Sequence, residues 1–226
     1  MEQKQLFIKS KIIIVIMLCF INYISADSEK IKSFKEIKYL DINRQTAEFT
    51  CGIAVLSTLF NYYGISTTEE EITNEFFKKM VEEKRGITFL DMKEYAISKG
   101  FEAYGYKMNY SGLIKIIGET SLPIIVHMKY NFPEKEVKHF GLIICNIGDD
   151  WLVLDDTEVG RKIISKDKFL SLWTGYAMII KPNSNSEELL RNIHKKIEKR
   201  KTEASLNVSK IYLYQNYPIV KHYFSF

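Results

Sequence analysis

The chain has 226 residues, of which 46% are hydrophobic and 13% aromatic, and this suits one globular domain with a sizeable core plus appendages. Its formal net charge is only +4. This weak charge gives no electrostatic basis for binding nucleic acid, and we expect no such partner.

The first 26 residues have the pattern of an export signal. Lysines precede an unbroken apolar run from Ile12 to Ile21, and Asn22-Tyr-Ile-Ser-Ala26 follows before Asp27. We therefore predict a signal peptide over 1–26 and an exported protein, periplasmic or extracellular, whose mature chain begins near Asp27. The alternative is an uncleaved anchor, although this run falls well below the ~20 residues that span a bilayer. Contact with the membrane is expected only through this segment.

A cysteine opens the next distinctive stretch. Thr50 can cap an apolar helix from Cys51 to Tyr63 that Gly64 ends. Because backbone N–H groups and the helix dipole favour a thiolate at a helix N-terminus, Cys51 can act as a nucleophile. Gln45, six residues earlier, adds a neutral donor that could reach the oxyanion formed when the sulfur attacks a carbonyl.

The rest of the chain predicts packing helices followed mainly by sheet. Capping boxes at Thr68 and Thr88 start two helices that end near Glu83 and Gly100. After these helices the pattern predicts a further helix over 111–118 and a short one capped by Ser165. It predicts strands over 101–107, from 123, and over 139–145, 151–155, 161–164 and 176–181. We divide the chain into 1–26, a domain over 27–181, and 182–226, which holds a linker, a charged helix over 187–201 and an aromatic tail.

Two cysteines remain after export, and two interpretations of them exclude each other. In an oxidising compartment Cys51 and Cys145 could form a disulfide. Alternatively, Cys51 could work with His139. If 139–145 is a strand, its ends lie roughly 20 Å apart. A Cys51 close enough to His139 for proton transfer then cannot reach Cys145, because bridged Cα atoms lie within about 7 Å.

Nucleophilic catalysis needs a nucleophile, a base and a group that orients the base, and Cys51, His139 and Asp155 supply them in that order. Strand parity tests the choice of acid, because only one of Asp155 and Asp156 can share the face of His139. An odd-length connection between the two strands would select Asp155 and an even-length one Asp156. We predict an odd-length connection and Asp155.

The chain resembles the bacteriocin-processing, or double-glycine, cysteine peptidases from about Leu40 to Lys181. The shared motifs are Gln45 before Cys51-Gly52, Ile53-Ala-Val-Leu leading to Asn61-Tyr-Tyr-Gly64, Gly86-Ile-Thr, Gly100-Phe-Glu-Ala, Leu122-Pro-Ile-Ile-Val-His, His139-Phe-Gly-Leu-Ile-Ile, an aspartate sixteen residues further on, and Phe169 to Trp173-Thr-Gly. The chain departs from the pattern at Thr50 and Asp156, where the family often has Asp and Pro. It also has no Gly-x-x-x-x-Gly-Lys-Ser/Thr phosphate loop, so we expect a free-standing exported relative without transporter domains.

The resemblance implies an α+β, papain-like fold in which the nucleophile helix packs on a C-terminal antiparallel sheet. It assigns Cys51 as nucleophile, His139 as general base and acid, Asp155 as the group that orients the imidazole, and Gln45 as oxyanion donor, and it makes His127 structural. It implies a peptide or protein substrate and no cofactor or metal. Two alternatives stay open: a papain-like amidase acting on cell-wall peptides, and a non-catalytic member that binds peptides in the same groove.

Overall fold

The computed structural model describes residues 33–47, 49–131, 135–183 and 186–216. The predicted signal peptide and the last ten residues of the predicted aromatic tail lie outside these residues. The chain divides into two compact units, Met1–Ile37 and Lys38–Phe226. The described part of the first unit is the start of the short helix α2 (Phe34–Lys38), where the Ser33 hydroxyl accepts a hydrogen bond from the Glu36 N–H.

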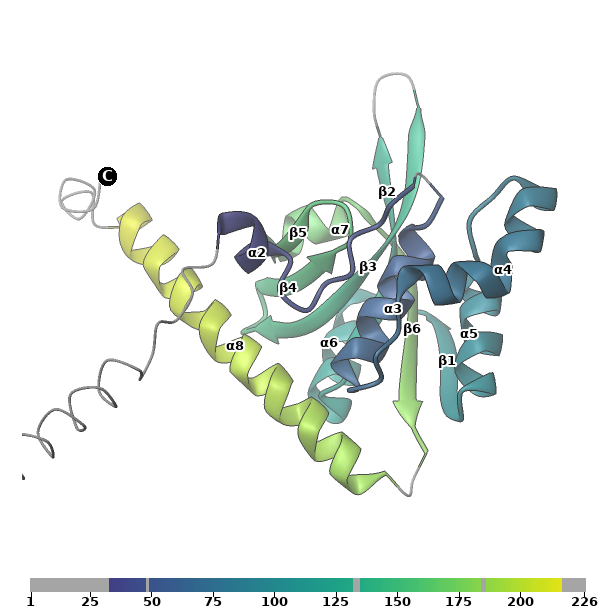
Figure 1. Ribbon diagram of the computed structural model, residues 1–226. Coiled ribbons are helices and arrows are strands. Elements are labelled where there is room, and N and C mark those ends of the chain that lie inside the picture. The colour runs from purple at the N-terminus through teal and green to yellow at the C-terminus, as the bar shows by residue number, and fades with distance from the viewer. Residues whose placement is uncertain (1–32, 48, 132–134, 184–185, 217–226) are drawn as a thin grey trace, which may run out of the picture. The chain divides into compact units, whose positions relative to one another are not determined.

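The second unit combines helices with one six-stranded antiparallel sheet (Figure 1). Its helices are α3 (Cys51–Tyr62), α4 (Glu69–Glu83), α5 (Phe89–Ser98), α6 (Tyr110–Thr120), α7 (Lys166–Leu170) and α8 (Glu187–Asn216). Its strands are β1 (Phe101–Lys107), β2 (Ile124–Asn131), β3 (Glu136–Ile147), β4 (Trp151–Asp156), β5 (Gly160–Ser165) and β6 (Trp173–Pro182), in the order β1-β6-β2-β3-β4-β5. The predicted α+β class and the antiparallel second half are confirmed.

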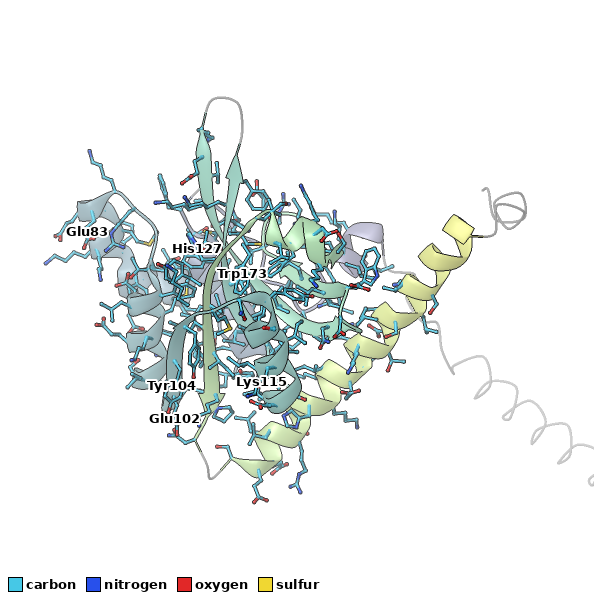
Figure 2. The ribbon with its side chains drawn as sticks, turned by 180° about the vertical axis from the view of Figure 1, so that it is seen from behind. Glu83, Glu102, Tyr104, Lys115, His127 and Trp173 are labelled. Carbon is cyan, nitrogen blue, oxygen red and sulfur yellow. The ribbon has the colours of Figure 1, made fainter. Side chains whose placement is uncertain are left out.

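The sheet is covered on both faces, so it separates two apolar clusters. On one face α3 packs on β3 and contributes Ile53, Leu56 and Leu59, all fully buried. On the other face α6 and α7 cover the sheet with Leu113 and Phe169. Seen from behind, Lys115 marks α6 in front of the strands (Figure 2). The α3 helix is apolar almost all round because it lies between the sheet and other helices.

The capping signals at Thr68, Thr88 and Ser165 are confirmed, whereas at α3 the predicted start is right but the predicted cap is absent. Thr68 and Thr88 both form the predicted capping boxes. Thr50 does not cap α3. Instead its hydroxyl donates a hydrogen bond to the Ala47 carbonyl at 3.0 Å and accepts one from the Ala47 N–H at 3.2 Å. The first turn of α3, which begins at Cys51, therefore presents backbone N–H groups that no Thr50 side chain occupies.

The β3–β4 hairpin contains an extra residue that the sequence did not indicate. Ile147 pairs with Trp151 across a three-residue turn, so the connection is odd in length, as predicted. Between Ile143 and Cys145 the register shifts by one residue. This β-bulge at Ile144 reverses the parity of every pair beyond it, and Asp155 pairs with Leu142.

The β4–β5 turn is also sterically fixed. Asp156 pairs with Gly160 across a three-residue loop, and Gly160 has a φ of +83°. A Cβ at Gly160 would lie 2.8 Å from the Lys38 carbonyl oxygen, so glycine alone fits there. This turn sets the backbone that follows Asp156.

The C-terminal helix is twice as long as expected. The sequence predicts a helix over 187–201, whereas α8 continues to Asn216. Its inner side buries Ile193, Ile197, Arg200 and Ala204. No helix in the described part of the chain is long and apolar enough to cross a membrane.

Candidate active site

Cys51 and His139 come together from different elements. Cys51 is the first residue of α3 and is half-buried, and His139 lies in β3 with only 4% of its surface exposed. Burial alone would lower the pKa of His139, but hydrogen bonds to the Asp156 and Cys51 side chains outweigh burial and raise that pKa to about 9. The imidazole is therefore a cation at neutral pH.

Asp156 is the acid that contacts His139. Its Oδ1 lies 3.2 Å from His139 Nε2, which leaves the other ring nitrogen, Nδ1, to exchange a proton with the thiol. The same Oδ1 accepts hydrogen bonds from the Glu158 and Val159 N–H groups at 3.0 and 3.2 Å. The Lys162 ammonium lies 3.0 Å from Oδ2. Although burial raises the pKa of Asp156, His139 and Lys162 hold it well below its usual range, so the carboxylate stays ionised.

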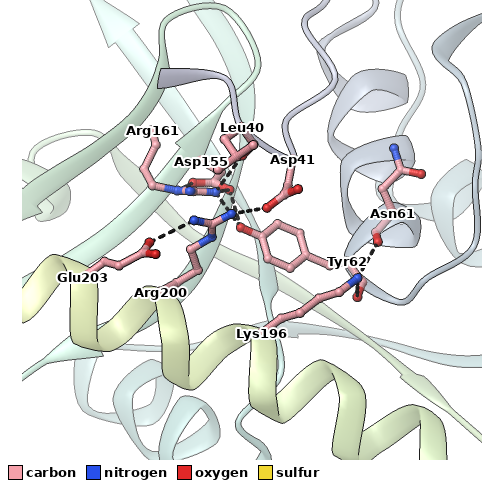
Figure 3. Close-up of polar contacts among 9 residues, drawn as sticks. All are labelled: Leu40, Asp41, Asn61, Tyr62, Asp155, Arg161, Lys196, Arg200 and Glu203. Atoms are coloured by element: carbon pink, nitrogen blue, oxygen red, sulfur yellow. Dashed lines mark hydrogen bonds and ion pairs between the residues drawn. The ribbon is translucent and has the colours of Figure 1, made fainter. Parts of the chain in front are cut away.

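The prediction that Asp155 orients His139 is wrong. The Asp155 carboxylate accepts two hydrogen bonds from Arg161, each 2.7 Å long, and one from the Tyr62 hydroxyl at 2.9 Å (Figure 3). The physical reason is the bulge at Ile144. Continuing the register from the Leu142–Asp155 pair places Asp156 opposite Gly141, two residues from His139 on the same face. Asp155 therefore points to the α3 side of the sheet.

Gln45 is held by its backbone and by its carboxamide oxygen. Its N–H donates to the Thr157 carbonyl at 3.1 Å, and its Oε1 accepts a hydrogen bond from the Thr157 hydroxyl at 3.0 Å. This fixes which end of the amide is engaged and turns the NH₂ group away from Thr157. Gln45, His139 and Asp156 line one cavity of about 730 Å³. The structure thus brings Gln45 to the His139 side of the site.

Several residues of the site were missed by sequence reasoning. Thr157 and Lys162 were overlooked because nothing in their local pattern marks them, although both lie within six residues of Asp156. Glu69 is buried and accepts hydrogen bonds from the Thr46 N–H and hydroxyl, both at 3.1 Å. It therefore anchors the residue next to Gln45. Glu69 is the first residue of α4, and acidic residues are common in the first turn of a helix. Its sequence position therefore gave no sign of the contact with Thr46.

A second cavity, of about 620 Å³, opens at Cys51 itself. Aromatic rings form much of its wall, from Phe49, Phe89, Phe140 and Tyr176. Gly86 lies so close to the chain before Cys51 that a Cβ there would be 2.6 Å from the Phe49 carbonyl oxygen. The two cavities share Val137 and Lys138 in β3, so they adjoin on this strand.

His127 lines the cavity at Cys51 but is engaged elsewhere. Its Nδ1 lies 2.9 Å from the Thr174 hydroxyl, and its ring packs edge-on against Phe140. Burial lowers the pKa of His127, so it is neutral at pH 7. These contacts agree with a structural role.

Cys51 and Cys145 are both free, so the disulfide interpretation is not the arrangement seen. Cys145 is buried, and burial raises the pKa of its thiol to about 12, which keeps it protonated and unreactive. Among the described residues, no group of three or more His, Cys, Asp or Glu side chains is arranged to hold a metal ion.

Comparison with known proteins places these residues in a family. The family model described as "Peptidase C39 family" matches residues 40–185. The probable functional amyloid protease FapD of Pseudomonas fluorescens is 27% identical over 156 residues, which cover 67% of this chain and 65% of that protein. The match thus spans just under two thirds of this relative. The pediocin PA-1 transport/processing ATP-binding protein PedD of Pediococcus acidilactici is 25% identical over 155 residues, or 68% of this chain and 20% of PedD.

Solved structures show the same fold. The peptidase domain of Streptococcus ComA superposes with a TM-score of 0.53 at 24% identity, over 63% of this chain and 98% of that one. A double glycine motif protease from an AMS/PCAT transporter, in complex with its leader peptide, gives 0.51 at 23% identity, over 63% and 91%. Both support the predicted papain-like architecture. Because the family model covers well over half of the chain and includes Cys51, His139 and Asp156, the chain belongs to the peptidase C39 family.

Proposed function

We propose that this protein is an exported peptidase that cleaves peptide bonds with a Cys51–His139–Asp156 triad and a Gln45 oxyanion donor. The observation that carries the proposal is the chain of contacts from Cys51 through His139 to the buried Asp156 carboxylate. A nucleophile, a base and an orienting acid in hydrogen-bond sequence are the parts that nucleophilic catalysis requires.

The geometry supports a two-stage reaction. In the first stage the Cys51 thiolate attacks the peptide carbonyl, and the oxyanion is stabilised by the Gln45 amide and the Cys51 backbone N–H. His139 then donates its proton to the departing amine, which leaves a thioester on Cys51. In the second stage His139 takes a proton from water, and the resulting hydroxide hydrolyses the thioester. Asp156 holds the imidazole in one orientation throughout.

The cavities favour a peptide over a small molecule as substrate. The aromatic cavity of about 620 Å³ opens at Cys51, and the polar cavity of about 730 Å³ lies on the side of His139 and Gln45. Because they adjoin along β3, an extended chain could occupy both with its scissile bond at Cys51. A substrate with residues on each side of the cleaved bond would fill this arrangement.

Replacement of the two cysteines should have opposite effects. Cys51→Ala should abolish turnover, since it removes the nucleophile, whereas Cys145→Ala should retain it and cost at most some stability. The measurement is hydrolysis of a fluorogenic peptide selected from a library with the parent enzyme. Peptide mapping after iodoacetamide treatment at pH 7 should find the label on Cys51. Turnover that survives Cys51→Ala would contradict the nucleophile assignment, and a parent chain that binds peptides without cleaving them would favour a non-catalytic member.

The two adjacent acids should differ in their effect on the pH profile. The Asp156 carboxylate raises the pKa of His139 to about 9. Asp156→Asn should therefore move the alkaline limb of kcat/KM to lower pH and reduce kcat on the order of 10²-fold. Asp155→Asn should leave that limb in place and lower the free energy of unfolding, by roughly 3–5 kcal/mol if Arg161 is left unpaired. If the alkaline limb of kcat/KM moved in Asp155→Asn and not in Asp156→Asn, Asp155 would be the acid that orients His139.

Gln45→Ala should reduce turnover without affecting the thiolate. Losing one oxyanion donor typically costs ~10²–10³ in kcat. The rate at which iodoacetamide alkylates Cys51 should stay the same, because alkylation forms no oxyanion. A loss of turnover smaller than threefold would show that Gln45 is not an oxyanion donor.

The export part of the proposal is supported by the sequence of residues 1–26 alone. We expect the mature protein from its native host to begin at or near Asp27. Mass spectrometry of the protein recovered outside the cytoplasm measures this directly. Recovery of the whole chain from Met1 in the membrane fraction would show that the segment is an anchor.

A further inference from the structure

The C-terminal helix α8 begins just beyond the stretch that matches the family, yet it is part of the packed unit. The family match ends at residue 185, and α8 starts at Glu187. Ile193 and Ile197 on its inner side are buried in the cluster that also contains α3. A helix that buries apolar side chains against the α3 face of the sheet is held firmly enough to position other groups.

One charged residue of α8 is buried with the apolar ones. The Arg200 side chain is only 10% exposed and forms ion pairs with Asp41 and Glu203 (Figure 3). The contact with Glu203 lies within α8, at 2.9 Å. The contact with Asp41 reaches a residue 159 positions earlier in the chain. Burying a guanidinium requires such partners, because an unpaired buried charge is strongly unfavourable.

Asp41 begins the short segment that ends at Gln45. Its φ is +65°, a left-handed conformation that residues other than glycine seldom adopt. The preceding carbonyl, that of Leu40, accepts a hydrogen bond from Arg161 at 3.2 Å. Two guanidinium groups, one from α8 and one from β5, therefore hold the chain at residues 40 and 41. Their contacts hold the backbone turn at Asp41.

The same cluster reaches both sides of the site. Arg161 also binds Asp155, the neighbour of Asp156, and the Tyr62 hydroxyl at the end of α3. The segment after Asp41 is held at further points: Asn43 donates to the Thr58 hydroxyl, and Gln45 is bound by Thr157. Asp41 is thus the first of several anchors between the protein body and the Gln45 carboxamide.

We propose that Arg200 is a positioning residue for the reaction: through its ion pair with Asp41, α8 fixes the start of the segment 41–45 and so the place of the Gln45 carboxamide at the oxyanion. This inference rests on the proposed role of Gln45. It means that α8 contributes to the geometry of the site as well as to the packing of the sheet. Since the segment has other anchors, loss of Arg200 should loosen Gln45 without releasing it.

The test compares single and double variants of the full chain. Arg200→Gln removes the ion pair, and Arg191→Gln removes the same charge from an exposed position on the same helix as the matched control. With the selected fluorogenic peptide, we expect Arg200→Gln to lower kcat about tenfold with KM nearly unchanged, while Arg191→Gln behaves as the parent does. The rate of Cys51 alkylation by iodoacetamide should not change, because the Cys51–His139 pair does not depend on Gln45.

The decisive measurement is non-additivity. If Arg200 acts through Gln45, the change Arg200→Gln should have less than a twofold effect on kcat in a Gln45→Ala background. The same tenfold loss in that background, or a parallel loss of Cys51 alkylation, would overturn the inference. If Arg200→Gln does not fold, Asp41→Asn removes the negative charge of the same ion pair from its more exposed end, where the side chain is 49% exposed. If the parent chain shows no turnover, the proposed function itself is contradicted. If the parent is active but Arg200→Gln still lowers kcat tenfold in the Gln45→Ala background, only the inference about Arg200 fails.

Discussion

The extra residue at Ile144 in β3 decides what each of two adjacent acids does. Without it, strand pairing would place Asp155 on the face of His139 and Asp156 on the face of α3. With it, the pairing beyond the bulge shifts by one residue, and the roles are exchanged. The protonation state of His139 therefore depends on a backbone irregularity further along the same strand.

The exchange places two buried carboxylates on opposite faces of one strand, with different partners. Asp156 shares its oxygens among His139, Lys162 and two backbone N–H groups, so its charge is used to hold an imidazolium. Asp155 is neutralised by the planar guanidinium of Arg161 in a two-pronged contact. The Asp155–Arg161 pair links β4 to β5, because the two residues lie opposite each other on these strands. Each carboxylate is compensated separately, which keeps two neighbouring charges compatible with burial.

Much of this arrangement could be predicted from sequence, because it depends on local signals. Thr68 and Thr88 located helix starts through capping boxes, and the odd length of the β3–β4 turn was predicted correctly. The bulge could not be predicted, because Ile143, Ile144 and Cys145 are all buried strand formers and none marks an extra residue. The failure of Thr50 to cap α3 has a similar origin, since its hydroxyl is engaged by the Ala47 backbone, a contact set by the path of the preceding loop.

The separation of the two free cysteines has a consequence for the oxidised enzyme. A cysteine at the start of a helix, such as Cys51, is a group that peroxides can convert to a sulfenic acid when it is ionised. Sulfenic acids are rescued most readily by a neighbouring thiol that forms a disulfide. Cys145 is buried and protonated, so it offers no such resolving thiol. Of the two cysteines that the structure describes, neither then restores the other, and reduction of an oxidised Cys51 would need a small-molecule or protein reductant that can enter the cavity at the start of α3.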